Sequence, residues 1–228
     1  MTLQLVLFDI DGTLLDGHGI GRAATSRAML ELFGTVGRLD SHNFAGKTDW
    51  GTLCELLNRD EADVGRHMPA YEASIERHMR DLAPQFELHP LPGALETVQA
   101  LRDRPDFILG IVTGNASVTT PIKLAAAGFD PAWFPVRACG SEAASRNDLP
   151  PLALQRARAQ SGQAIAPQDV TVVGDTPADV ACAQALGARA VAVSTGFSTR
   201  EALVAARPDH LLDDISELLP LCGVTSVD

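Results

Sequence analysis

The chain alternates short apolar runs with amphipathic helical patterns. Four of these runs are rich in β-branched residues and stop at glycine, threonine or aspartate: LQLVLFDIDG (3–12), FILGIVTGN (107–115), DVTVVGDTP (169–177) and ARAVAVSTG (188–196). Strands that are buried on both faces have this continuous apolar character, so the pattern predicts a parallel sheet. Two weaker strand patterns occur at 133–140 and 209–213.

Helical patterns fall between the predicted strands, at 93–102, 121–127, 151–160, 177–186 and 199–206. The fourth carries its own start and stop signals: Thr176 can cap the helix, Pro177 suits its first position and Gly187 can end it. Strands that alternate with helices in this way predict an α/β fold with a doubly wound parallel sheet and a Rossmann-like core.

Residues 16–88 interrupt the alternation. They contain only helical patterns, such as RAATSRAMLELFG (22–34) and PAYEASIERHMRDL (69–82). A segment of about 70 residues is too long for an ordinary crossover between strands. We therefore predict an inserted all-helical cap domain at 16–88, on a catalytic core made of 1–15 and 89–228.

Composition excludes several classes of function. The 228 residues carry a formal net charge of −11 and no run of basic residues, which argues against sequence-independent binding of nucleic acid. The four cysteines form no CxxC pair, so free thiols in a reducing cytoplasm are expected rather than a zinc site or disulfides. We expect neither a signal peptide nor a membrane span, because no basic leader and no apolar run near 18 residues occurs. Monomer and homodimer are both compatible with the sequence.

The residues that end the strands are candidates for chemistry, because ligands of parallel sheets bind at the carboxyl ends of the strands. Asp9 and Asp11 follow the first strand one residue apart and can point the same way before Gly12 lets the chain turn. Two such carboxylates repel unless a cation lies between them or one is protonated. With Asp175 arriving from another strand, the all-oxygen set suits Mg²⁺ better than zinc.

Three motifs carry a family resemblance. DIDGT (9–13), TGN (113–115) and GDTPAD (174–179) resemble motifs one, two and four of the haloacid dehalogenase superfamily, in the expected order. The resemblance spans nearly the whole chain, since the helical insertion is similar to that superfamily's cap. It implies a Mg²⁺-dependent phosphatase that hydrolyses a small phosphomonoester, as phosphoglycolate phosphatase-like proteins do, through an aspartyl-phosphate.

The same resemblance implies roles for individual residues. Asp9 would attack the phosphorus, and Asp11 would protonate the leaving oxygen and then activate water. Thr113 would hold the phosphoryl oxygens together with Gly114 and Asn115 of the same motif.

The implied metal ligands are Asp9, the carbonyl of Asp11, and Asp175. Asp179 is either a further ligand or a helix cap, because Thr176-x-x-Asp179 also fits a capping box.

Motif three departs from the commonest pattern, which has a lysine between motifs two and four. The only lysines are Lys47 and Lys123, and neither lies after Ala126. Arg146 directly precedes a proline-started helix, as the family's cation does, and is the best candidate. Arginine supplies the fixed charge that this role needs, and its fork suits phosphate oxygens.

Substrate specificity and reaction type are less constrained. FAGKTDW (44–50) resembles the cap's substrate loop, from which Lys47 can reach an anionic group, and Arg22 is an equally reachable alternative. Asp11 favours phosphoryl transfer, because dehalogenases of this superfamily generally lack the second aspartate. A phosphomutase of the β-phosphoglucomutase type remains an alternative, and so does a non-catalytic relative that binds a phosphometabolite or a partner. The intact aspartates and Thr113 favour an enzyme.

Overall fold

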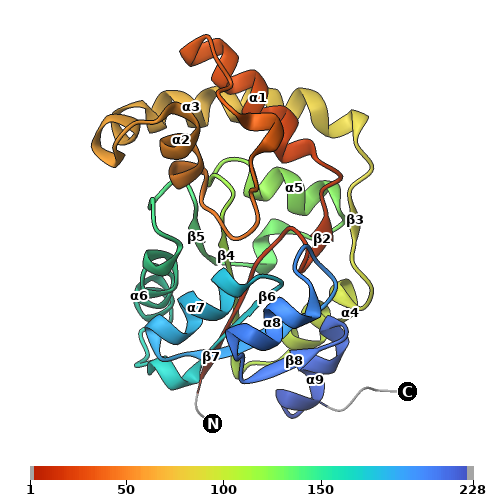
Figure 1. The fold of residues 1–228 in the computed structure, drawn as a ribbon. Coiled ribbons are helices and arrows are strands. Elements are labelled where there is room, and N and C mark those ends of the chain that lie inside the picture. The colour runs from red at the N-terminus through yellow and green to blue at the C-terminus, as the bar shows by residue number, and fades with distance from the viewer. Residues whose placement is uncertain (1–2, 225–228) are drawn as a thin grey trace.

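The computed structural model describes residues 3–224 and contains one parallel sheet of six strands in the order β5-β4-β1-β6-β7-β8 (Figure 1). Each neighbouring pair is parallel. The strands are β1 (Gln4–Phe8), β4 (Phe107–Thr113), β5 (Val136–Cys139), β6 (Val170–Gly174), β7 (Arg189–Val193) and β8 (His210–Leu212). All six lie within runs predicted from the sequence.

Helices cover both faces of this sheet, so two hydrophobic cores form. Alternate residues of β1 face opposite sides: Val6 and Phe8 lie in one core, and Leu5 and Leu7 lie in the other. The helices of this part are α4 (Ala94–Arg102), α5 (Thr120–Ala126), α6 (Leu149–Ser161), α7 (Pro177–Leu186), α8 (Arg200–Ala206) and the short α9 (Leu218–Leu221). The predicted doubly wound α/β fold is confirmed.

Helix α7 begins and ends at the residues that the sequence predicted. The Thr176 side chain accepts the backbone N–H of Asp179, and Pro177 opens the helix. Gly187 ends it with a φ of 77°, a left-handed conformation that costs little without a Cβ. This capped helix begins directly after β6, which fixes the loop that carries Asp175.

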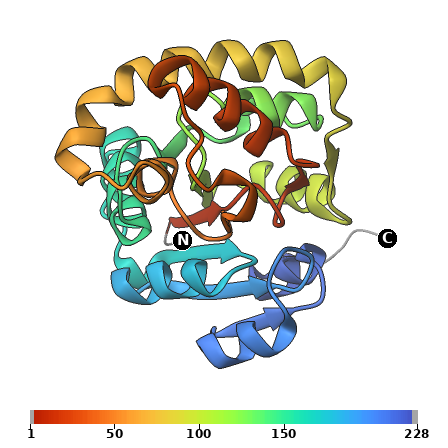
Figure 2. The same ribbon diagram turned by 45° about the horizontal axis from the view of Figure 1, so that its top comes forward.

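Three helices of the insertion form a layer over the carboxyl edge of the sheet (Figures 1 and 2). They are α1 (Ile20–Phe33), α2 (Asp49–Leu57) and α3 (Glu61–Leu82). Buried residues of α1 and α3, among them Met29, Tyr71 and Ile75, belong to the same hydrophobic core as Phe8. The helices predicted for this insertion are therefore present and pack onto the α/β core.

A small ribbon joins the cap to the core. Strands β2 (Leu15–Asp16) and β3 (His89–Pro90) pair antiparallel where the chain leaves the core and returns to it. The hydrophobic pattern did not predict this ribbon, because strands of two residues are too short to show a period. None of the helices in residues 3–224 combines the length and the hydrophobicity that a membrane span requires.

The central strand provides a test of the core. We expect Leu7→Ala to lower the free energy of unfolding by about 2–5 kcal/mol, since Leu7 is fully buried and its truncation leaves a cavity. Leu30→Ala, at a side chain that is 54% exposed, should change it by less than about 0.5 kcal/mol. Urea unfolding followed by circular dichroism measures both. Equal losses of unfolding free energy in the two variants would contradict the placement of Leu7 in the core and of Leu30 at the surface.

Candidate active site

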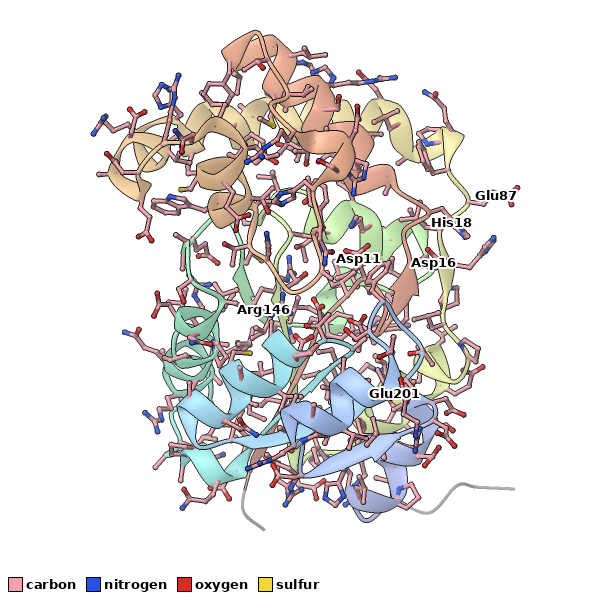
Figure 3. All side chains as sticks on the ribbon, in the orientation of Figure 1. Asp11, Asp16, His18, Glu87, Arg146 and Glu201 are labelled. Carbon is pink, nitrogen blue, oxygen red and sulfur yellow. The ribbon has the colours of Figure 1, made fainter. Side chains whose placement is uncertain are left out.

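The carboxyl ends of three adjacent strands form one wall of a cavity. Asp9 follows β1, Thr113 ends β4 and Asp175 follows β6, and these strands are neighbours in the sheet. The cavity has a volume of about 270 Å³ and is lined by residues of both the core and the cap. Asp11 and Arg146 lie at the level between the cap helices and the sheet (Figure 3). The structure therefore brings together the strand-end residues predicted from the sequence.

Three buried carboxyl groups meet at this wall. Asp9, Asp175 and Asp179 each offer an oxygen within 4.8 Å of the others. Burial raises the pKa of Asp9 to about 6 and that of Asp175 to about 8, and the charge of Asp179 pushes both in the same direction. Carboxylate oxygens without histidine or cysteine form the kind of donor set that Mg²⁺ prefers. The cluster fits a magnesium ion.

Two glycines leave room for Asp175. A Cβ on Gly12, whose φ is +84°, would lie 2.5 Å from Asp175 Oδ2, and one on Gly196 would lie 2.0 Å from it. The backbone N–H of Phe197 donates to the same oxygen at 2.7 Å. Gly12 therefore serves two needs, the left-handed turn after Asp11 and the close approach of a carboxylate.

Arg146 reaches the acidic cluster from a 3₁₀ turn, Arg146–Asp148, directly before α6. Its side chain is 6% exposed, and Nη2 lies 3.1 Å from Asp9 Oδ2 and 2.5 Å from Asp179 Oδ1. The two carboxylates raise the pKa of the guanidinium above its usual range in spite of its burial. Arg146 thus occupies the position predicted for the motif-three cation, and its catalytic role stays a prediction.

Asp179 has both carboxylate oxygens engaged by protein groups. Oδ2 accepts the Thr176 backbone N–H at 3.0 Å and the Thr176 hydroxyl at 2.7 Å, while Oδ1 pairs with Arg146. The capping box that was one of the two roles considered for Asp179 is present. These contacts favour Asp179 as a support for Arg146 and α7, and its role as a metal ligand stays a prediction.

The TGN segment after β4 links the phosphate-binding candidates to Asp11. Asn115 Nδ2 donates to Thr113 Oγ1 and to Asp11 Oδ2, each at 2.8 Å. A Cβ on Gly114 would lie 1.9 Å from the carbonyl oxygen of Lys47, so the cap loop rests directly on this glycine. Asn115 therefore joins Thr113 to Asp11, and the role of Thr113, Gly114 and Asn115 in binding phosphate stays a prediction.

The cap is closed onto the loops that follow β4 and β5. Near the start of α2, the Asp49 N–H donates to the Gly114 carbonyl at 2.8 Å, and the Trp50 N–H donates to the Gly140 carbonyl at 2.9 Å. From α3, Glu72 accepts the hydroxyls of two core serines, Ser117 and Ser141. Backbone and side-chain contacts together hold the cavity shut on this side.

Both cationic candidates of the cap line the cavity. Lys47 Nζ pairs with Glu55 Oε2 at 2.5 Å and is one-third exposed. Arg22 donates to the carbonyls of Leu39 and His42, and its guanidinium lies 4.6 Å from the ring centre of Phe44. Arg22 forms no ion pair within residues 3–224. Its charge is therefore less compensated than that of Lys47.

Lys123 is a site residue that sequence reasoning missed. The order of the motifs excludes it from the motif-three position, yet its ammonium lies 2.6 and 2.7 Å from the two Asp11 oxygens and 2.8 Å from Asn115 Oδ1. One signal was present in the sequence: Lys123 is the sole charged residue between Phe107 and Phe129. A lone charge in so apolar a segment calls for a buried partner.

A comparison with known families agrees with the geometry. The model of the haloacid dehalogenase-like hydrolases matches residues 3–187. The chain belongs to this family. The family assignment made from motifs one, two and four is thereby confirmed.

Similar proteins within this hydrolase family carry phosphatase names. The chain is 30% identical over 219 residues to a phosphoglycolate phosphatase of Synechococcus elongatus, covering 95% of this chain and 96% of the relative. It is 28% identical over 225 residues to the pyrophosphatase PpaX of Bacillus pumilus, covering 97% of each. The expected enzyme class, a phosphoric monoester hydrolase of this superfamily, is confirmed.

Solved structures share the fold. Phosphate-bound CbbY of Rhodobacter sphaeroides superposes with a TM-score of 0.71 at 21% identity, covering 95% of this chain and 96% of that one. A predicted phosphatase of Clostridium acetobutylicum gives 0.68 at 21% identity, with coverages of 97% and 99%.

The raised pKa values predict how metal-free stability depends on pH. In the unfolded chain these carboxyl groups have a pKa near 3.8, whereas folding raises the pKa of Asp9 to about 6 and that of Asp175 to about 8. The folded protein then holds protons that the unfolded chain has lost, so metal-free stability should fall as pH rises from about 4 to about 8. Mg²⁺ needs ionised carboxylates, so its stabilising shift in Tm should be larger near pH 8 than near pH 5.

Asp175→Asn is the informative variant in this experiment. Removal of one carboxylate relieves repulsion, so the metal-free variant should melt above the wild type near pH 8 and show no Mg²⁺ shift. Asp103→Asn, at an exposed carboxyl, should behave like the wild type. A Mg²⁺ shift that is equal at both pH values, or that survives in Asp175→Asn, would show that the ion binds elsewhere.

Proposed function

We propose that this hydrolase is a Mg²⁺-dependent phosphatase that acts on a small phosphomonoester through an aspartyl-phosphate. The observation that carries the proposal is the placement of Asp9 and its partners. Asp9 lies buried at the cavity wall in contact with the Arg146 guanidinium, and Asp11 is hydrogen-bonded through Asn115 to Thr113. A nucleophile, an acid and base, and a phosphate-holding group thus face one cavity.

In the proposed first step, an Asp9 carboxylate oxygen attacks phosphorus as the bond to the leaving oxygen breaks. Asp11 gives its proton to that oxygen, and the alcohol leaves. A water molecule then attacks the phosphoryl group and passes a proton to Asp11. The bond to Asp9 breaks, inorganic phosphate is released, and both carboxyl groups regain their starting states.

Fixed donors would hold the phosphoryl oxygens during both steps. Thr113 and the N–H of Gly114 lie at the end of β4, and Arg146 supplies a charge that stays fixed at neutral pH. Mg²⁺, held by Asp9, the Asp11 carbonyl and Asp175, would neutralise charge between the anionic nucleophile and the anionic substrate. Gly12 and Gly196, packed against Asp175, would keep that carboxylate in place for the ion.

The cavity favours a small, anionic substrate. Its volume of about 270 Å³ lies just below the usual range for ligand pockets, about 300–1,000 Å³, and Arg22 and Lys47 line its cap side. One relative is named phosphoglycolate phosphatase and another pyrophosphatase, and both names refer to small anionic phosphate compounds. We therefore propose a small phosphate ester with a second anionic group, such as 2-phosphoglycolate.

The proposal includes the organisation of the chain. Residues 16–88 would form a separate cap domain that opens for substrate, and 1–15 with 89–228 would form the catalytic core. The protein would act in the cytoplasm as a monomer or homodimer.

Release of phosphate tests the proposed activity. The full chain should hydrolyse 4-nitrophenyl phosphate with Mg²⁺ and lose activity in EDTA. Asp9→Asn, which keeps the shape of the side chain but removes the nucleophile, should lower kcat by about a thousandfold or more. A panel of 2-phosphoglycolate, pyrophosphate and sugar phosphates then ranks substrates by kcat/KM.

Other outcomes identify the alternatives. Interconversion of sugar phosphates without phosphate release would establish a mutase in place of a phosphatase. A kcat/KM for pyrophosphate far above that for every ester would identify a phosphoanhydride, and not a monoester, as the substrate. No turnover with metal present, or full activity in Asp9→Asn, would contradict the proposed mechanism.

A further inference from the structure

Lys123 on α5 is a buried charge that the proposed chemistry does not use. The residue is 2% exposed, and α5 lies between the sheet and the cap helices (Figure 1). An ammonium group has three donor hydrogens, and three oxygens surround this one: both carboxylate oxygens of Asp11 and Oδ1 of Asn115, at 2.6 to 2.8 Å. A buried ammonium is costly unless it is fully paired in this way.

Asn115 fixes the same arrangement from the other side. Its Oδ1 accepts Lys123, and its Nδ2 donates to Asp11 Oδ2 and to Thr113 Oγ1. Every polar atom of the carboxamide therefore has a partner, and its orientation is determined by those partners. A continuous row of contacts runs from Lys123 through Asp11 and Asn115 to Thr113.

The chain makes room for this row where it enters the cap. A Cβ on Gly17 would lie 2.6 Å from Asp11 Oδ1, closer than real Cβ contacts allow. A Cβ on Gly21 would lie 3.5 Å from Lys123 Nζ, an ordinary van der Waals distance, so the constraint falls on Gly17. The absence of a side chain at Gly17 is therefore a condition for the observed position of the Asp11 carboxylate.

Without Lys123, the Asp11 carboxylate would keep the hydrogen bond from Asn115 Nδ2 but lose its ion pair. Its side chain is 25% exposed, so solvent is within reach, and the neighbouring carboxyls of Asp9 and Asp49 would repel it. Arg146 cannot replace the lysine, because its ion pairs are with Asp9 and Asp179. Each of the two motif-one aspartates thus has its own cation.

We propose that Lys123 is a positioning residue that holds the Asp11 carboxyl group beside Thr113, where it can exchange a proton with the leaving oxygen. This inference rests on the proposed phosphatase function and adds to it a residue from outside the four motifs. Lys123 itself touches neither the phosphoryl group nor the leaving group in this assignment. Its effect passes through the Asp11 carboxyl group and through Asn115, both of which it contacts.

Leaving-group dependence separates this role from general support of the fold. Protonation of the leaving oxygen matters greatly for an alkoxide and little for a dinitrophenolate, which is stable as an anion. Lys123→Met keeps the length and apolar stem but removes the ammonium. It should lower kcat/KM for 2-phosphoglycolate, or for the best alkyl ester of the panel, about tenfold or more beyond its effect on 2,4-dinitrophenyl phosphate.

Three further variants complete the experiment. Asp11→Asn should shift the ratio of alkyl to aryl activity in the same direction, and Arg102→Met, at an exposed arginine, should leave it unchanged. Gly17→Ala places a methyl group against Asp11 Oδ1 while Lys123 remains, and should lower the same ratio. If Lys123→Met does not fold, as judged by circular dichroism, Lys123→Gln, which keeps two donor hydrogens but removes the charge, takes its place.

The outcomes distinguish this inference from the proposed function. An unchanged ratio of alkyl to aryl activity in the folded Lys123 variant, whether or not both activities fall, would overturn the positioning role. Wild-type activity dependent on Asp9 would then still support the phosphatase. No Asp9-dependent hydrolysis by the wild type would overturn both.

Discussion

Asp9, Asp175 and Asp179 place three carboxylates within 4.8 Å of one another where water barely reaches, and the rest of the site follows from this crowding. Burial and mutual repulsion both oppose ionisation, as the raised pKa values of Asp9 and Asp175 show. Such a cluster keeps its charge only beside a compensating cation, and the Arg146 guanidinium pairs with two of its three carboxylates. The carboxylates are crowded because the strands of a parallel sheet end at a common edge. The loops beyond that edge supply the positive charge that compensates them.

The cap is tied to the same edge by groups that also shape the site. The Gly114 carbonyl accepts the N–H of Asp49 at the start of α2, and the Gly114 Cα lies under the Lys47 carbonyl. The phosphate-binding candidate and the cap loop therefore share one contact. Movement of the cap would release Gly114 and expose the cavity together, which joins access of substrate to the geometry of phosphate binding.

Much of the fold was predictable from the sequence because strands buried on both faces are continuous apolar runs. The capping box of Thr176 and Asp179 was also visible, since it depends on residues three apart in one helix. The β2–β3 ribbon and the contacts of the cap were not, because they depend on backbone groups and on pairs distant in sequence. Lys123 was missed for a related reason: motif order is linear, whereas α5 folds back to the loop after β1.

The choice of cation at each aspartate follows from the geometry of its acceptors. One Nη of Arg146 lies between Asp9 and Asp179, and a guanidinium keeps its charge even at 6% exposure. Lys123 instead has three acceptor oxygens around a single nitrogen, which matches the three hydrogens of an ammonium. A lysine at 146 would have to lose hydration as a compact ion between two buried carboxylates, whereas the planar guanidinium is less strongly hydrated. Arginine in place of the family's usual lysine is therefore consistent with the dryness of this position and with the second carboxylate that Asp179 brings to it.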